Sequence, residues 1–325
     1  MKLRTNTARV ALLLSGVAAA VSILKLGAVP FVTREKRWSI GIYSGPSPFD
    51  LHAADTVVNP VLSALDVTDV PAKFVADPFM IRKDPAWYMF FEVLNEKSRH
   101  GEIGFATSRD ALHWRYGGIV LTEPFHLSYP YVFAVDNQYY MIPESGEARS
   151  IRLYTSQDFP TRWTLAATLV DGVAFVDSSV VQYERTWFLF TETRPSADDT
   201  LGLYYADMLA GPWREHPQSP IVTHDAHTSR PAGRVVVLNG KLFRYAQDDA
   251  PSYGARVFAF EITDLTRTSY RERPVGEFPI VAASGDGWNA AGMHHVDAHA
   301  LGENAWIACV DGAQRHWAIR WYSWQ

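Results

Sequence analysis

The chain has 325 residues, a formal net charge of -5, 47% hydrophobic residues and 13% aromatic residues. This composition excludes a disordered chain, and the scattered positive charges argue against a nucleic-acid partner. The single cysteine, Cys309, excludes an internal disulfide and a cysteine-based zinc site. The length suits one large all-β domain or two domains of average size.

The first element is an N-terminal segment with the order of a signal peptide. Basic residues precede the uncharged apolar run 10–24, and 26–32 is apolar again. We expect 1–33 to be a cleaved signal peptide or an uncleaved membrane anchor, because the run is short for a spanning helix but can be extended. Either would place the rest of the chain in the periplasm or outside the cell. The alternative is an amphipathic helix packed on the domain.

A repeat of about fifty residues follows, and each unit contains the same series of strand-like runs. Aromatic or aliphatic runs that end on an acid or an amide lie at 87–92, 139–144, 187–192, 242–247 and 306–311. A strand-like run precedes each of them, at 74–81, 129–135, 175–181, 232–238 and 293–301. A third run follows each, at 103–107, 151–155, 201–206, 255–261 and 318–323. An aromatic residue marks the fourth strand or its approach in four units: Trp114, Trp163, Trp213 and Tyr270.

Four strands per unit at this period predict an all-β fold, a five-bladed β-propeller. The fifth unit has no fourth strand of its own, while the run 38–43 stands unassigned before the first blade. We therefore expect this N-terminal strand to close the ring, which removes the open sheet edges. The predicted propeller covers 38–325. Two stacked β-sandwiches are the alternative, but they would not explain five acid-ended second strands.

Candidate catalytic residues lie where the first strand of each blade would line the centre. Carboxylates that converge there suit glycosidic chemistry, in which one acid protonates the leaving oxygen and another activates water or attacks. Our candidates are Asp77, Glu144 and Asp177. Each has a structural alternative: Asp77 could cap its own turn, Glu144 could be a solvated turn acid, and Asp177 could bond to nearby backbone. Glu92 and Glu192 share the strand-end position of Glu144, so the repeat itself could require an acid there.

Candidate binding residues surround these acids. They are His126, Tyr129 and Tyr131 in the segment HLSYPY, the strand-end acids Glu92 and Glu192, the group Arg230, Gln247 and Asp248, and His294, His295 and Asp297 in GMHHVDAH. Arg230 with its two neighbours could clamp an anion or a hydroxyl, or simply pair with Asp248 for structure.

The last-blade histidine motif offers a second kind of site. In a strand, His295, Asp297 and His299 would share one face, which could hold a sugar or a metal. We expect no required cofactor, with a divalent cation near His295 as the one candidate. The expected partner is a glycan or glycoconjugate. We further expect a monomer, with membrane attachment through the N-terminus if the segment is not cleaved.

Several of these motifs together resemble a known family. VADPFM, HLSYPYVF, IPES, FVDSS, RPAG, RYAQDD and GMHHVDAH look like the N-terminal domain of plant glucosamine inositolphosphorylceramide transferases and its bacterial stand-alone relatives, from residue 38 to the end. That domain is similar to the five-bladed propellers of glycoside hydrolase families 43, 32 and 130. The resemblance implies a carbohydrate-active centre. In the plant proteins it assigns transferase chemistry to a separate downstream domain.

The resemblance also implies residue roles. Asp77 matches the general-base position of family 43, and His294 or His295 matches its histidine near the centre. The Asp expected in the second blade has no match in HLSYPY, and Asp177 stands where a Glu acid is expected. Three functions follow: a glycoside hydrolase-like enzyme, a non-catalytic glycan-binding module for polysaccharide or glycolipid assembly, or a glycosyl-transferring or phosphorolytic propeller in which Arg230 and the histidines hold a phosphate.

Overall fold

The computed structural model describes residues 28–323 and the side chains of 31–319. The chain divides into two units, 37–314 and a second unit formed by 1–36 with 315–325. Most of the expected signal peptide or anchor lies outside the described residues, and its last residues, 28–33, begin a strand. Among the described residues, no helix is both long and apolar enough to cross a bilayer.

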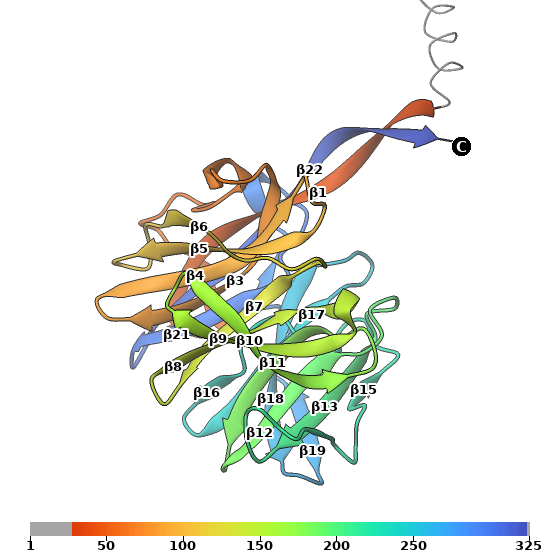
Figure 1. Ribbon diagram of the computed structural model, residues 1–325. Coiled ribbons are helices and arrows are strands. Elements are labelled where there is room, and N and C mark those ends of the chain that lie inside the picture. Colours follow the sequence, from red (N-terminus) through yellow and green to blue (C-terminus); the bar gives the residue numbers. More distant parts are fainter. Residues whose placement is uncertain (1–27, 324–325) are drawn as a thin grey trace, which may run out of the picture. The chain divides into compact units, whose positions relative to one another are not determined.

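Unit 37–314 is a five-bladed β-propeller, as the repeat predicts (Figure 1). The first blade contains β3 (Ala72–Lys83), β4 (Ala86–Asn95), β5 (Gly101–Ser108) and β6 (Arg115–Leu121). The second contains β7 (Ser128–Val135), β8 (Gln138–Glu144), β9 (Ser150–Asp158) and β10 (Arg162–Asp171). The third contains β11 (Val176–Tyr183), β12 (Thr186–Glu192), β13 (Thr200–Ala206) and β14 (Arg214–Glu215), with β15 (Val222–Thr223) also paired to β13.

The last two blades vary this plan. The fourth contains β16 (Val236–Leu238), β17 (Lys241–Asp248), β18 (Arg256–Leu265) and β19 (Tyr270–Pro274), with β20 (Val281–Ala282) also paired to β18. The fifth contains β21 (Val296–Gly302), β22 (Ala305–Ser323), β1 (Ala28–Ser47) and β2 (Asp50–Ala53). In the described part of the chain, helical structure is limited to three short 3₁₀ turns, η1 (Ala64–Asp66), η2 (Gly146–Ala148) and η3 (Gly287–Asn289).

Closure of the ring by the N-terminal strand is confirmed, because β1 pairs with β22. One detail of the prediction is wrong. The run 318–323 does not form a separate third strand but continues β22. β1 takes the third place of the blade and β2 the fourth. The physical reason is edge pairing: β1 satisfies the backbone groups along the open edge of β22, so the chain does not need to turn back on itself.

Tight hairpins join the first and second strands of the middle blades. Two consecutive residues with left-handed φ form each turn: Asp136 and Asn137, Glu184 and Arg185, and Asn239 and Gly240. Such turns match the right-handed twist of paired strands. They fix the register of each hairpin, so the acid that ends each second strand returns to the start of the first.

The repeated tryptophans close the turns that lead into the fourth strands. The indole N–H of Trp114 donates to the carbonyl of Ala111 at 3.0 Å, and that of Trp163 donates to Pro160 at 2.8 Å. The Trp213 indole donates to Leu209 in the same way, at 3.0 Å. These indoles are buried or partly buried and need such a partner, which explains why the sequence repeats this residue.

The first strands meet at the centre of the propeller, which we call the hub. β3 packs against β7, β7 against β11, and β21 against β3. A parallel bridge between Gly233 and Val296 links the fourth and fifth blades. Glycine is required at 233, because its φ is 142° and an added Cβ would lie 1.8 Å from the Val296 carbonyl oxygen. The hub thus brings residues from all five blades together.

Candidate functional site

Three first strands carry a β-bulge at the same position. The register shifts at 76–79 in β3, at 128–131 in β7 and at 176–179 in β11. The residues at these bulges, Asp77, Tyr129 and Asp177, have φ angles of 52°, 43° and 50°. Non-glycine residues rarely adopt this left-handed conformation, and strained backbone persists only where the surrounding packing enforces it. The repeat therefore fixes one side chain per blade at the hub.

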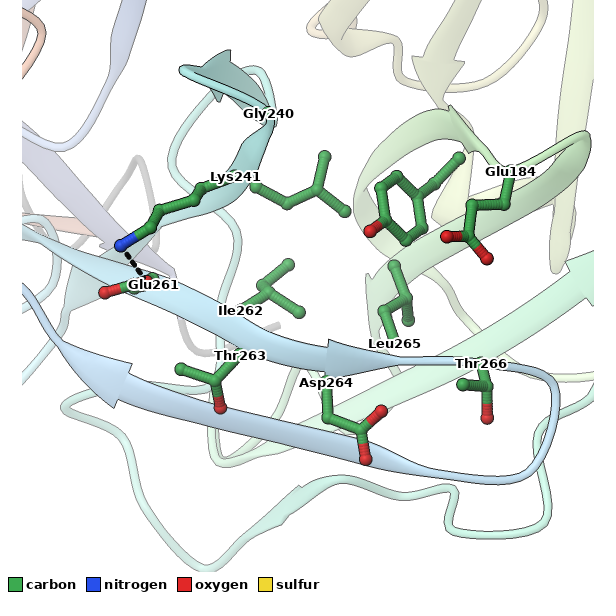
Figure 2. A pocket seen from close by; sticks show the side chains of 11 residues that line it. Glu184, Gly240, Lys241, Glu261, Ile262, Thr263, Asp264, Leu265 and Thr266 are labelled. Carbon is green, nitrogen blue, oxygen red and sulfur yellow. Dashed lines mark ion pairs between the residues drawn. The ribbon is translucent and has the colours of Figure 1, made fainter.

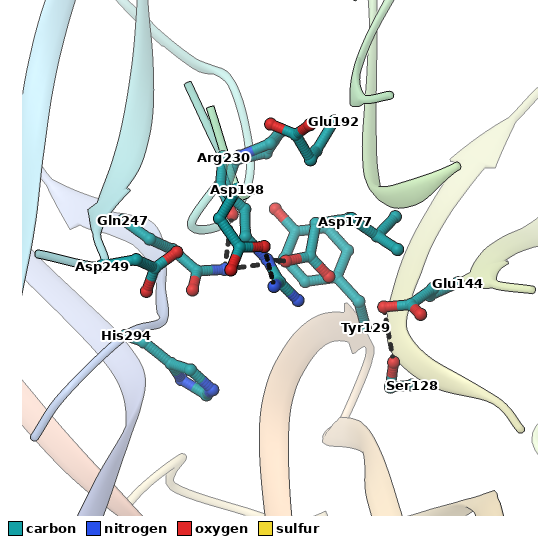
Figure 3. Close-up of polar contacts among 12 residues, drawn as sticks. Ser128, Tyr129, Glu144, Asp177, Glu192, Asp198, Arg230, Gln247, Asp249 and His294 are labelled. Carbon is teal, nitrogen blue, oxygen red and sulfur yellow. Dashed lines mark hydrogen bonds and ion pairs between the residues drawn. The ribbon is translucent and has the colours of Figure 1, made fainter. Parts of the chain in front are cut away.

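The acids predicted at the ends of the second strands lie beside these bulges. Glu92, Glu144 and Glu192 each pair in the ladder with the residue that precedes a bulge. Gln247 and Asp311 stand at the aligned positions of β17 and β22. Figure 3 shows Glu144, Glu192 and Gln247 around the carboxylate of Asp177. The residues at the bulges and the residues that end the second strands thus meet in one polar cluster, which we call the hub cluster.

Asp77 belongs to a buried group with His294 and Asp311. Nδ1 of His294 lies 2.6 Å from Asp311, and its Nε2 lies 3.8 Å from Asp77. Asp311 also accepts hydrogen bonds from the backbone N–H groups of Asp77, His294 and His295 at 3.0 to 3.2 Å. Asp311 therefore fixes both the histidine ring and the bulge of β3.

Asp77, His294 and Asp311 differ in how their surroundings shift their pKa values. Burial raises the pKa of Asp77 to about 7, with the charges of Asp177 and Asp311 adding to the rise and His294 opposing it. Burial alone would lower the pKa of His294, but the carboxylate of Asp311 raises it above its ordinary value. The pKa of Asp311 is held below its usual range, since His294 outweighs the effect of burial. The pKa of Asp77 thus lies near neutral pH, so this carboxyl group can exchange a proton there.

Aromatic rings frame His294. Trp38 of β1 stacks on the imidazole with ring centroids 3.9 Å apart and planes 8° from parallel. Tyr253 meets the same imidazole edge-on at 5.3 Å, and the Arg230 guanidinium lies 5.1 Å from the Tyr253 ring centroid. These contacts lock the orientation of His294 and bring the ring-closing strand into the hub.

Asp177 is held by a clamp from the fourth blade. The guanidinium Nε of Arg230 donates to it at 2.5 Å and the amide of Gln247 at 2.7 Å (Figure 3). A second guanidinium nitrogen of Arg230 donates to Asp198 at 2.9 Å. Burial would lower the pKa of Arg230, but Asp177 and the other nearby acids raise it. A charge-assisted clamp of this kind fixes the position of Asp177.

Glu144 has fewer partners than Asp177. Its carboxylate accepts one hydrogen bond, from the Ser128 hydroxyl at 2.9 Å (Figure 3). Burial raises its pKa to about 8, and the negative charges of Asp177 and Asp77 add to the rise while Arg230 opposes it. Glu144 is therefore protonated at neutral pH and can donate a proton. The hub cluster therefore contains two carboxyl groups, Glu144 and Asp77, whose pKa values burial raises toward neutral pH, where a group can serve in acid–base catalysis.

Glu92 and His126 lie next to each other. The imidazole Nε2 of His126 is 3.4 Å from Glu92, and its Nδ1 accepts from the backbone N–H of Gly101 at 2.9 Å. Burial raises the pKa of Glu92 well above its usual range and lowers that of His126. Glu192 differs, because it accepts backbone N–H groups of Arg194 and Thr200. In the third blade the repeated acid thus holds the backbone of the connection between β12 and β13.

Two predicted binding residues link the blades to one another. The Tyr129 hydroxyl accepts the backbone N–H of Gly233 at 2.6 Å and lies 2.9 Å from Ser179. The Tyr131 hydroxyl donates to the Val180 carbonyl at 2.6 Å. Tyr129 is fully buried. At the bulge where the first and third blades have Asp77 and Asp177, the second blade therefore has a tyrosine that spans the hub.

The residues of the last-blade motif GMHHVDAH lie in three different environments. His294 joins Asp77, whereas His295 packs against Phe79 at 4.5 Å and Tyr129 at 5.2 Å. Burial lowers the pKa of His295 to about 4, so this imidazole is neutral. Asp297 lies on β21 and meets His299 at 2.8 Å. Asp297 and His299 share a face as expected, while His295 precedes the strand.

Asp297 forms a buried clamp between blades. The guanidinium of Arg234 donates to one oxygen at 2.8 Å, and the backbone N–H of Met80 donates to the other at 2.6 Å. Arg234 also donates to the carbonyls of Met80 and Val132. Burial would raise the pKa of Asp297, but Arg234 and His299 lower it well below its usual range. This pair joins the first, second, fourth and fifth blades.

Asp248 lies at the end of β17 and orders the segment that follows. One carboxylate oxygen lies 2.9 Å from His227 and accepts the backbone N–H of Ala250 at 3.1 Å. The other accepts from Arg256 at 2.7 Å. Asp248 pairs with Arg256 rather than with Arg230, and its effect on the hub cluster is indirect.

Five residues that lie at the hub were not among the candidate site residues: Trp38, Asp198, Asp249, Tyr253 and Asp311. Trp38 comes from the closing strand, and Asp198, Asp249 and Tyr253 come from connections between strands. Asp311 was visible as a strand-end acid in the repeat, which was the available signal. The other four depend on the three-dimensional course of loops, which a local pattern does not reveal.

A surface depression of about 370 Å³ lies elsewhere, between the third and fourth blades (Figure 2). Its lining includes Glu184 in the β11–β12 turn and Lys241 at the start of β17. Lys241 forms an ion pair with Glu261 at 2.9 Å. Because the start of β17 is opposite the end that carries Gln247, this depression is separate from the hub cluster.

The protonation of Glu144 predicts a pH-dependent stability. An unfolded glutamate ionises near 4.5, whereas the folded pKa is about 8. Between these values the unfolded state releases the proton and the folded state retains it, so the free energy of unfolding falls as pH rises. Glu144→Gln is expected to flatten this fall, measured as Tm across that pH window. Exposed Glu303→Gln is the control, and equal slopes in both variants would contradict the prediction.

The comparisons with known proteins agree with this architecture. The family profile described as glucosamine inositolphosphorylceramide transferase 1, N-terminal, matches residues 32–313. Glucosamine inositolphosphorylceramide transferase 1 of Oryza sativa subsp. japonica is 38% identical over 299 residues, which are 86% of this chain and 40% of that protein. The Arabidopsis thaliana protein of the same name is 33% identical over 300 residues, 86% of this chain and 39% of that protein.

A solved structure with a similar fold is the catalytic domain of a Coprinopsis cinerea GH62 alpha-L-arabinofuranosidase. It superposes with a TM-score of 0.58 at 13% identity and covers 86% of this chain and 97% of that chain. This likeness concerns the fold alone. The chain spans about two fifths of the length of the plant relatives. The matched profile and the plant identities show that the chain belongs to the family of the N-terminal domain of glucosamine inositolphosphorylceramide transferase 1.

Proposed function

We propose that this propeller acts on a glycan at the hub cluster by acid–base chemistry, with Glu144 as the acid and Asp77 as the base or nucleophile. The observation that supports this most is the pair of buried acids from neighbouring blades that have different partners: Glu144 accepts from the Ser128 hydroxyl, whereas Asp77 faces the His294 imidazole. Burial raises the pKa of Glu144 to about 8 and that of Asp77 to about 7, so both can exchange protons near neutral pH. Two carboxyl groups with different surroundings are typical of glycosidic catalysis.

The proposed roles follow from the contacts of each residue. Glu144 would donate its proton to the glycosidic oxygen as the bond from that oxygen to the sugar carbon breaks. Asp77 would take a proton from the attacking water or acceptor hydroxyl, or attack the carbon itself. Asp177, our third catalytic candidate, is engaged by Arg230 and Gln247, which suits substrate orientation better than proton donation.

The binding candidates would act around this pair. Glu92 and His126 lie next to each other and would contact sugar hydroxyls. His294 would hold Asp77 in place. We assign Tyr129, Tyr131, Glu192, Asp248, His295 and Asp297 to the support of the hub, because the structure places their polar groups against protein atoms or their rings in the packing.

A non-catalytic glycan-binding module is the second candidate. The observation that favours it is Tyr129, which occupies the position where the glycosidase pattern has an Asp. The relatives are named as transferases, and this chain spans only part of their length. A phosphorolytic or glycosyl-transferring propeller is less well supported, since the Arg230 guanidinium already serves Asp177 and Asp198 and an anion would compete with both.

A divalent cation would find its donors at Asp77, His294 and Asp311, whose ligand atoms lie within 4.8 Å of one another. The fit is poor. Both oxygens of Asp311 already accept backbone N–H groups, and one also meets the His294 Nδ1. The expected position near His295 fits no better, because its ring is enclosed by Phe79 and Tyr129. The proposed acid–base mechanism therefore includes no metal ion.

We further propose that the protein works as a monomer in the periplasm or outside the cell, with residues 1–33 as its signal peptide or anchor. The support is the sequence of that segment, with basic residues before an apolar run.

Screening of the full chain on a glycan array, with product analysis of every hit, tests the proposed function. Glu144→Gln is expected to lower turnover of an alkyl or sugar glycoside by about a hundredfold to ten-thousandfold. An aryl glycoside, whose leaving group needs little protonation, should lose much less. Glu303→Gln, an exposed change of the same chemistry, serves as the control. Binding without product from the unaltered chain would make the hub cluster a recognition site.

A further inference from the structure

The second unit of the chain contains a two-stranded ribbon, defined as residues 28–36 of β1 and 315–323 of β22. Figure 1 shows these two strand ends side by side. Large apolar side chains are exposed on it: Phe31 is 48% exposed, Val32 63%, Trp317 67% and Ile319 68%. The Arg34 guanidinium lies 4.4 Å from the ring centroid of Trp317. Exposed apolar groups gathered on so short an element indicate a docking surface.

Charge separates the ribbon's unit from the propeller. The ribbon, residues 28–36 and 315–323, contains four Lys and Arg against one Glu, a net charge of +3. The propeller, residues 37–314, contains 22 Lys and Arg against 34 Asp and Glu, a net charge of -12. The element that exposes Trp317 and Ile319 is therefore positively charged, whereas the propeller is negatively charged. Such asymmetry indicates an acidic partner surface.

We propose that, in the chain that keeps residues 1–33 as an anchor, the ribbon docks on the surface of a bilayer that contains anionic lipid. Three residues separate the apolar run 10–24 from the first residue of β1, so a segment suited to a membrane leads directly into the ribbon. Tryptophan is enriched where lipid headgroups meet the acyl chains, and arginine can keep its charge among phosphates while its stem lies on apolar surface. Trp317 with Arg34 has this combination.

A second copy of the chain is a poorer occupant of this surface. It would bring two ribbons of net charge +3 together, and like charges that meet across an interface weaken association. The negatively charged propeller of another copy could attract the ribbon, but it would not account for the apolar run that precedes β1. Anionic lipid satisfies both the charge and the exposed apolar side chains.

The test uses the full chain reconstituted in vesicles of phosphatidylcholine, with or without phosphatidylglycerol. Hydroxyl-radical labelling is read residue by residue by mass spectrometry. The four basic residues of segment 1–27 also attract anionic lipid, so the ribbon is followed through the labelling of its own residues. We expect several-fold lower labelling of Trp317 and Ile319 when phosphatidylglycerol is present, and recovery at high salt. Phe278 and Met208, which are 81% and 62% exposed in the propeller, should not change.

Reversal of two ribbon charges, Arg34→Glu with Arg315→Glu, should abolish the protection, since each basic residue near an anionic surface contributes about fivefold to partitioning. Arg271→Glu with Arg273→Glu, two exposed arginines of β19, is the matched control and should leave the protection intact. Labelling of Trp317 that is the same with and without phosphatidylglycerol would overturn the proposal. Protection that appears without lipid and grows with protein concentration would also overturn it and indicate a second copy.

Discussion

Replacement of Asp77 by asparagine is expected to lower glycan turnover by about a thousandfold while glycan binding persists. The reason is chemical rather than steric. Asparagine tolerates the left-handed φ of 52° at this bulge, and its side-chain oxygen can still accept the backbone N–H of Tyr129. What it loses is the ability to take a proton. Turnover per molecule, measured on the glycans that the unaltered chain converts, is the readout.

The pH profile makes this prediction sharper. With Asp77 as base and Glu144 as acid, kcat/KM should rise with pH through about 7 and fall above about 8. The rising limb should disappear from the residual activity of Asp77→Asn. The matched control is Asp136→Asn, which makes the same change at an exposed turn with a φ of 49°. Retained turnover with an unchanged rising limb in Asp77→Asn would remove Asp77 from the mechanism.

Much of the fold could be predicted because the blade plan is local. Aromatic strands, tight turns and strand-end acids recur at a fixed period, and each unit needs a neighbour to bury its faces. The order of strands in the fifth blade could not be predicted in the same way. The runs 38–43 and 318–323 have the same strand-forming character, and only the pairing of β1 along β22 decides which of them is the third strand.

The site was partly predictable for a related reason. Asp77, Asp177 and Glu144 belong to the repeat, so their convergence follows from the blade plan. The different contacts that these acids make do not follow from the blade plan. The clamp of Arg230 on Asp177 spans 53 positions, and Asp311 binds the backbone of Asp77 across 234. Contacts of that separation distinguish an engaged carboxylate from one that can exchange a proton, and no local spacing reveals them.

Loss of Arg234 is expected to destabilise the propeller by about 3–5 kcal/mol, because it leaves a buried charge without its partner. Asp297 is fully buried, and its carboxylate accepts from Arg234 at 2.8 Å. Arg234→Met would also free the carbonyls of Met80 and Val132, which lie on two neighbouring first strands. The measurement is the free energy of unfolding from urea titration. Arg273→Met, which removes an exposed arginine that pairs with Glu261, should cost at most about 1 kcal/mol.

The double variant Arg234→Met with Asp297→Leu separates two explanations of that loss. If the cost comes from the uncompensated carboxylate, removal of both charges should restore part of the stability that the single change lost. His299 would then lose its partner at 2.8 Å, but it is partly exposed and can be solvated. A single variant within 1 kcal/mol of the unaltered chain would contradict a clamp at the hub. A double variant less stable than the single one would instead indicate that Asp297 serves mainly the backbone of Met80.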